Sequence, residues 1–177
     1  LAIAFAAFSL NHSMIVSHIL PLLESRGVST GHAIIAASTI GAAQVFGRLV
    51  LIPLEQRVSM LLICSCALAG LSFASVNLAW AGASALILCF FVVFQGGSAG
   101  ISSIAKPTVT ADLLGRSNFG AISAVVSVAY ILGFASGPTL SGYIWSMAGY
   151  SGVLKTTFSL GLIGLICLVT AGRLTRS

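Results

Sequence analysis

The sequence predicts an all-α polytopic membrane protein, and three observations support this fold class. Apolar residues make up 58% of the 177 residues, and charged residues make up only 6%. The mean hydropathy is +1.10. A soluble domain carries about 25% charged residues, so a chain with so few charges would aggregate in water. The charges also divide the chain into apolar runs, and a run of about 20 residues is long enough to cross a bilayer as a helix.

The charge-free runs predict six transmembrane helices. No charge precedes Glu24, and a second run lies between Arg26 and Arg48. The run Val58–Ala105 would be roughly 72 Å long as one helix, more than twice the ~30 Å hydrocarbon core, so we expect it to fold back once. We place that turn at residues 76–82, the most polar and glycine-broken piece. Two more runs follow. The predicted helices, in a single bundle, are residues 1–23, 29–54, 58–76, 83–106, 118–146 and 153–172.

The basic residues in the loops predict the orientation. Six crossings place both termini on one side of the membrane. The basic residues of that side are Arg57, Lys106, Arg116, Arg173 and Arg176, whereas the other side has only Arg26 and Lys155. Because cytoplasmic loops are enriched in lysine and arginine, we expect both termini in the cytoplasm. The basic residues are scattered singly and form no patch that could follow a phosphate backbone, which excludes nucleic acid as a partner.

Polar side chains recur near the middle of four predicted helices, the first, second, fourth and fifth. These side chains are Asn11, His12, Gln44, Gln95 and Tyr130. The helices at 58–76 and 153–172 have no Asn, Gln, His or charged residue in their interiors. Polar groups inside a membrane are costly and by default indicate function. We therefore expect the four helices to form one wall of a solute cavity. The alternative is that these groups hydrogen-bond between helices and hold the bundle together.

Arg48 is the most informative single residue. It follows Gln44 by four positions, so the two side chains share one helix face, and it lies ~9 Å from the middle of its helix. A guanidinium group binds a carboxylate through two parallel hydrogen bonds. No acidic residue lies inside a predicted helix. We expect Arg48 to bind a substrate carboxylate. The alternative is that it reaches the headgroups or pairs with Glu55.

Small residues and a proline mark close packing in the fifth predicted helix. Gly133 and Gly137 form a GxxxG pattern, which permits close helix–helix approach. Pro138 follows directly and predicts a kink. Lys106 precedes Pro107 at the predicted end of the fourth helix, and we assign it to anchoring at the cytoplasmic interface.

Three segments carry a resemblance to a known family. The helix containing Gly41–Arg48 runs into the short loop Leu54–Arg57, and together they are similar to the second helix of a transporter half and its cytoplasmic loop motif. The run Gly133–Pro138 resembles an antiporter-type glycine–proline motif. The segment Ser13–Leu23, with the helix that carries Gln44 and Arg48, is similar to bacterial monocarboxylate and oxalate/formate transporters. The chain thus resembles the C-terminal six-helix half of a major facilitator superfamily transporter.

The resemblance implies a location, a mechanism and several residue roles. It implies the bacterial inner membrane and alternating access, with this bundle rocking against a missing N-terminal half or a second copy. Arg48 would contact the carboxylate, and Arg57 would belong to the gating loop. The glycines with Pro138 would let their helix bend or slide. The chain would be a fragment of a longer transporter.

The sequence therefore predicts transmembrane transport of a small organic anion, with no cofactor, no metal and no enzymatic activity. A metalloprotease pattern HExxH is absent from the chain. One alternative is a proton-coupled exporter of cationic or apolar compounds, which needs an intramembrane carboxylate that this chain lacks. The other is a structural or pore-forming bundle that does not couple transport to a conformational change.

Overall fold

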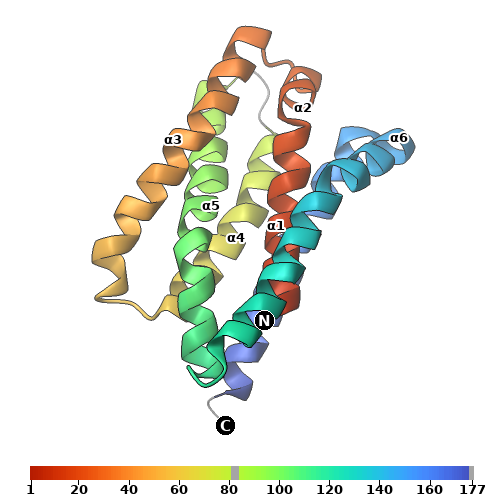
Figure 1. Cartoon of the computed structure of the whole chain (residues 1–177). Coiled ribbons are helices and arrows are strands. Elements are labelled where there is room, and N and C mark those ends of the chain that lie inside the picture. Colours follow the sequence, from red (N-terminus) through yellow and green to blue (C-terminus); the bar gives the residue numbers. More distant parts are fainter. Residues whose placement is uncertain (81–83, 176–177) are drawn as a thin grey trace.

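The described residues, 1–80 and 84–175, form six helices and no strand in a computed structural model (Figure 1), which confirms the all-α class. The helices are α1 (Ala2–Ser17), α2 (Ile19–Ser25), α3 (Thr30–Glu55), α4 (Met60–Ala79), α5 (Ala85–Leu114) and α6 (Phe119–Leu174). By length and composition, four of them could cross a membrane, and the bent pair α1–α2 would make a fifth. The chain is accordingly an integral membrane protein.

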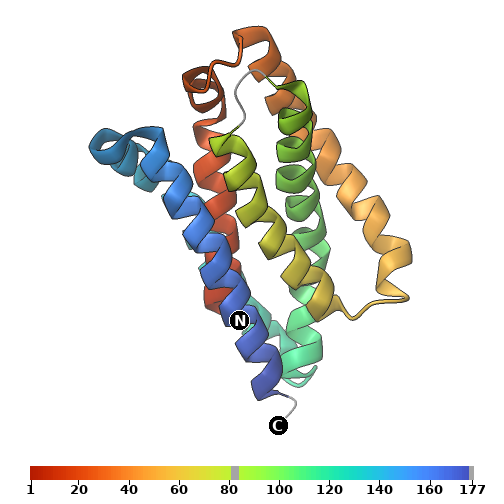
Figure 2. The same cartoon turned by 180° about the vertical axis from the view of Figure 1, so that it is seen from behind.

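Helix α6 consists of two arms joined at a single residue. Its 56 residues would make a straight helix of roughly 84 Å, far longer than a bilayer is thick. Gly149 breaks it with φ 63° and ψ −170°, a conformation that is essentially restricted to glycine. The second arm, 150–174, runs back in the opposite direction to the first arm, 119–148, and both arms pack against α1 (Figures 1 and 2). The loop expected between residues 146 and 153 is therefore one residue long.

The first predicted helix, 1–23, is broken in the structure. Helix α1 ends at Ser17, and α2 leaves it at an angle of 67° after His18. Pro21 explains the break, because proline lacks the N–H that would bond the carbonyl group of Ser17 and its ring clashes with that carbonyl.

The predicted end of the fourth span at residue 106 is wrong. Helix α5 continues through Pro107 to Leu114, so Lys106 lies inside the helix. A single proline removes one helical hydrogen bond, and packed membrane helices tolerate that loss. The expected bounds of α3 and α4 agree with the structure within three residues. The expected turn at 76–82 is shortened by α4, and residues 81–83 lie outside the described residues.

The helices form a front layer and a rear layer. Helices α3, α5 and α1 and the first arm of α6 make up the face seen in Figure 1, which we call the front face. Helix α4 and the second arm of α6 lie on the opposite side (Figure 2). Both chain ends lie at the same end of the bundle, which we call the terminal end (Figure 1). This end also holds the α3–α4 and α5–α6 connections. Arg176, which entered the predicted charge count, lies outside the described residues.

A polar layer divides the core at mid-depth. One apolar cluster, near α2, includes Leu22, Leu78 and Phe91. The other, near the terminal end, includes Phe8, Leu68 and Leu168. In α1, α4, α5 and the second arm of α6, buried polar residues come between or next to the two clusters. They are Ser9, Asn11, His12, Ser13, Ser72, Ser75, Gln95, Ser98, Ser102 and Thr157. Buried Thr110 and Ser141 lie outside this layer.

Candidate functional site

The GxxxG pattern of α6 forms a close seam with α1. A Cβ atom on Gly133 would lie 2.5 Å from the backbone oxygen of Ala6, and one on Gly137 would lie 2.5 Å from Ser13 Oγ. The α1 residues that face the seam, Ala6, Ser9 and Ser13, are spaced three and four apart, so they lie on one helix face. Ser9 Oγ donates to the Tyr130 carbonyl at 2.7 Å. The expected tight packing at the two glycines is thus present.

A hydroxyl group of α1 compensates for the N–H group that Pro138 lacks. Within α6 the non-helical backbone angles occur at Gly149 and not at Pro138. Proline has no N–H, so the carbonyl oxygen of Phe134, four residues earlier, lacks its helical donor. Ser13 Oγ donates to this oxygen at 2.7 Å. The hydroxyl of α1 therefore replaces the hydrogen bond that the proline removes.

Asn11 is directed toward the rear layer. Its Nδ2 donates to the Thr157 carbonyl in the second arm of α6 at 2.6 Å. Ser75 of α4 donates to the hydroxyl of the same Thr157 at 3.0 Å. Asn11 is 0% exposed, and its Oδ1 is a buried acceptor without a partner. The three side chains thus join α1, α4 and α6, which is the bundle-holding arrangement that the sequence left open.

His12 and Gln95 meet inside the polar layer. His12 Nδ1 lies 3.1 Å from Gln95 Nε2, which joins α1 to α5. Both residues are buried, with 8% and 0% of their surface exposed. Gln95 Oε1 is buried and has no partner. Two of the predicted site residues are therefore brought together by a hydrogen bond in the bundle interior.

A second glycine seam, between α3 and α5, was not anticipated from the sequence. A Cβ atom on Gly47 would lie 2.5 Å from the Gly97 oxygen, and one on Gly96 would lie 2.6 Å from the Ile40 oxygen. A Cβ atom on Gly100 would collide with the backbone of Gln44. Gly96 and Gly100 form a GxxxG pattern, which is the signal that could have revealed this seam. The seam fixes α3 close to α5 at the turn that precedes Arg48.

Arg48 uses this close approach to reach α5. Its Nε donates to Ser103 Oγ at 3.2 Å, and Ser103 in turn donates to the Gly100 carbonyl at 2.7 Å. The side chain is exposed on the bundle surface, with half-buried Gln44 one turn away. Its two terminal nitrogens make no hydrogen bond with residues 1–80 or 84–175. The planar fork of the guanidinium group is therefore free to bind an anion.

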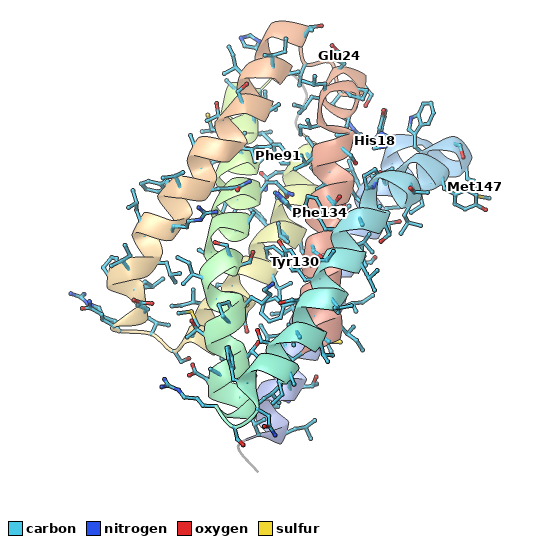
Figure 3. All side chains as sticks on the ribbon, viewed as in Figure 1. His18, Glu24, Phe91, Tyr130, Phe134 and Met147 are labelled. Carbon is cyan, nitrogen blue, oxygen red and sulfur yellow. The ribbon has the colours of Figure 1, made fainter. Side chains whose placement is uncertain are left out.

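Lys106 lies against the first arm of α6. Its Nζ donates to Ser127 Oγ at 3.3 Å and lies 4.5 Å from the centroid of the Tyr130 ring, a cation–π contact. Tyr130 lies between α5 and α6 (Figure 3). The ammonium group thus points to α6 rather than to the headgroup region that we had assigned to it. Because helix α5 does not end at residue 106, this role could not be read from the predicted span.

Arg48 is anchored one turn from Lys106 on α5. Ser103, which anchors Arg48, precedes Lys106 by three residues, so the two positions are neighbours on one helix face. Among the described residues, no carboxylate pairs with either cation. The predicted gating residue Arg57 is separate from this group, because it lies in the connection after α3 at the terminal end. We call Arg48, Ser103, Lys106, Ser127 and Tyr130 the cation cluster.

The residues Gly96–Gly100 also have the spacing of the GxSxG nucleophile motif. That motif works at a sharp turn between a strand and a helix. Here it lies within α5, and buried Ser98 faces Gly70 of α4. No group of three His, Cys, Asp or Glu residues in the described part of the chain is placed to hold a metal ion.

No protein-family model matches the chain, and no curated protein matches it.

Proposed function

We propose that this chain is one half of a secondary transporter of the major facilitator superfamily type, which moves a small organic anion across the membrane. The chain would cross the membrane six times, with the bent pair α1–α2 as the first crossing and the two arms of α6 as the last two. Its front face would meet the missing N-terminal half or a second copy. Alternating access would follow from rocking of the two bundles about the substrate.

The observation that carries the anion class is the cation cluster. Arg48 is bonded to Ser103 of α5, and Lys106 lies one turn further along α5 and points to α6. Neither cation has a carboxylate partner among the described residues. An unpaired charge within a membrane is costly, so a counter-charge from a ligand would stabilise this arrangement. The free fork of Arg48 matches the planar geometry of a carboxylate.

The two glycine seams support the moving parts of the mechanism. Both α3 and the first arm of α6 pack through small residues, at Gly100 and at Gly133. Small residues let packed helices approach closely and leave few interlocked side chains to hinder sliding. The two helices flank α5 and α1, so their movement would open or close the front face around the cation cluster.

A non-transporting bundle is the second candidate, and one observation favours it. Asn11 makes one interhelical hydrogen bond, and His12 and Gln95 share another. Such bonds hold a bundle together and need no substrate. The two candidates differ in what they predict for Arg48, because only the transporter needs its planar fork.

The test is uptake of labelled acetate, lactate and oxalate into vesicles that contain the protein in its assembled form, with its partner bundle or as a pair of copies. Arg48→Lys keeps the charge but loses the planar fork. We expect both Arg48→Lys and Arg48→Gln to reduce uptake by roughly 10- to 150-fold, the effect of losing a charged hydrogen-bond partner. Membrane expression should stay normal.

Arg116→Gln is the matched control, because it removes a cation from the exposed α5–α6 connection. It should leave uptake near the level of the unmodified protein. Normal uptake by Arg48→Lys would eliminate two-point carboxylate binding. An absence of saturable uptake of every anion by the assembled protein would favour the non-transporting bundle.

A further inference from the structure

A second positively charged site lies at the end of the bundle opposite the termini. A cavity of about 290 Å³ opens there between the α2–α3 turn, the end of α4 and the start of the second arm of α6. Its polar lining residues are Arg26, Ser75, Ser151 and Lys155. Its apolar lining residues are Val76, Ala79, Leu154 and Phe158. The cation cluster is at the other side of the mid-depth layer, so this cavity is not explained by the proposed transport.

The guanidinium group of Arg26 is only partly satisfied. Its Nη1 donates to the carbonyl of Ala79, the last residue of α4, at 3.3 Å, and its Nη2 donates to Ser151 Oγ at 3.4 Å. The Nε–H group is buried and has no partner. Arginine carries five N–H donors, and a buried donor without an acceptor is destabilising. Arg26 therefore keeps an N–H donor that has no acceptor among the described residues.

A second cation faces the same cavity. Lys155 is exposed and follows Ser151 by four residues, so the two side chains share one face of the second arm. Among the described residues, no carboxylate lines the cavity. Glu24, the acidic residue closest to Arg26 in sequence, accepts a hydrogen bond from Thr30 at 2.7 Å. The described lining thus combines two positive charges and two serine hydroxyl groups without a negative charge.

Aromatic residues place this cavity at the membrane surface. Trp80, which directly follows Ala79, is 78% exposed. Tyr150, which directly precedes Ser151, lies 5.9 Å from the ring of Trp145. Tryptophan and tyrosine are enriched at the depth of the lipid headgroups. The cations therefore lie at headgroup depth, whereas Val76 and Phe158 lie closer to the middle of α4 and of the second arm.

We propose that this cavity binds the phosphate group of an anionic phospholipid, with Arg26 and Lys155 as its cationic partners and Ser151 as a hydroxyl donor. Phosphate oxygens can accept two parallel hydrogen bonds from the planar guanidinium group of arginine. They also bind the compact positive charge of a lysine ammonium group. One acyl chain lies along Val76, Leu154 and Phe158, which gives a lipid an apolar contact that inorganic phosphate cannot make.

The experiment measures lipid binding to the full chain. Trp145→Phe leaves Trp80 as the single tryptophan reporter beside the cavity. Its fluorescence is then quenched with brominated phosphatidylglycerol or brominated phosphatidylcholine in mixed bilayers. We expect phosphatidylglycerol to bind more tightly than phosphatidylcholine. Neutralising either cation should lower the ratio of the two affinities by ~5-fold. Lys155→Gln is the primary variant, because that exposed side chain makes no hydrogen bond with the described residues that folding could require.

Arg26→Gln is the second variant, and Arg173→Gln, which removes a cation at the terminal end, is the matched control. The control should keep the phosphatidylglycerol preference. Equal quenching by the two lipids in the unmodified protein would overturn the proposal, and so would an unchanged preference in Lys155→Gln. Native mass spectra of the delipidated protein separate the sources of phosphate. A phosphatidylglycerol adduct supports a lipid site, whereas an adduct with inorganic phosphate alone refutes it.

Discussion

Replacement of Ser13 by alanine tests how Pro138 is tolerated inside a membrane helix. The Phe134 carbonyl has no helical donor, because residue 138 is proline, and Ser13 Oγ donates to it at 2.7 Å. Ser9 Oγ makes a bond of the same length one turn earlier, to the Tyr130 carbonyl. That carbonyl also has a helical donor, the N–H of Phe134. Two similar serines therefore differ in what their loss leaves behind.

The magnitudes follow from this difference. Ser13→Ala leaves a buried acceptor without a donor, and we expect it to lower the free energy of unfolding by about 1–2 kcal/mol. Ser9→Ala leaves its acceptor bonded within the helix, so we expect a loss near the average for interhelical hydrogen bonds, about 0.6 kcal/mol. Pro138→Ala restores the missing N–H. In that background, Ser13→Ala should cost no more than Ser9→Ala, which gives a coupling of about 1 kcal/mol.

The assay is reversible unfolding of the purified chain in mixed micelles by titration with dodecyl sulfate, followed by tryptophan fluorescence and circular dichroism. The double-mutant cycle isolates the pairwise term if each single variant stays folded. A coupling within about 0.3 kcal/mol of zero would refute the compensation of Pro138 by Ser13. Equal losses for Ser9→Ala and Ser13→Ala would refute it as well.

Two further predictions concern topology and packing. Single cysteines are placed at Asn77, Ser117 or Ser151 in a background without the native cysteines. Those at Asn77 and Ser151 should react with an impermeant reagent from outside, and the one at Ser117 only from inside. External labelling at Ser117 would reverse the orientation. Gly100→Ala should destabilise the bundle by about 1–3 kcal/mol, because its Cβ would meet the Gln44 backbone. Gly41→Ala, on α3 with no atom within 4 Å, should stabilise it by up to about 1 kcal/mol. The same denaturant titration measures both changes in the free energy of unfolding. Changes of the same sign in the two variants would contradict close packing of α3 against α5 at Gly100.

Local patterns located most of the helices, but not their breaks. The runs without charge placed α3 and α4 within three residues of their bounds, because a bilayer requires each span to be apolar and about 20 residues long. Hydropathy does not register backbone geometry. The bend at His18 was therefore not predicted, and the turn expected between residues 146 and 153 is a single residue, Gly149. The same limitation ended the fourth helix at Pro107, although α5 continues to Leu114.

The candidate site shows the same division. Arg48 was recognised from its isolation among apolar residues, and its binding role stays a prediction. Lys106 was assigned to anchoring, because its helix was expected to end there, and only the packing of α5 against α6 brings it to Tyr130. Asn11 and His12 are consecutive in sequence and were predicted to share one cavity. Adjacent helical positions point about 100° apart, so Asn11 meets Thr157 and His12 meets Gln95.

The sequence by itself determined that this protein is helical and membrane-embedded, because composition and run length are set by the solvent around each segment. The tertiary structure decided which polar groups meet. Hydrogen bonds require atoms to approach within about 3 Å, and that approach depends on where the glycines let two helices touch. Gly100 brings α3 close enough for Arg48 to reach Ser103. Gly137 does the same for Ser13 and Phe134. Such contacts join residues that are far apart in the chain, so no local pattern contains them.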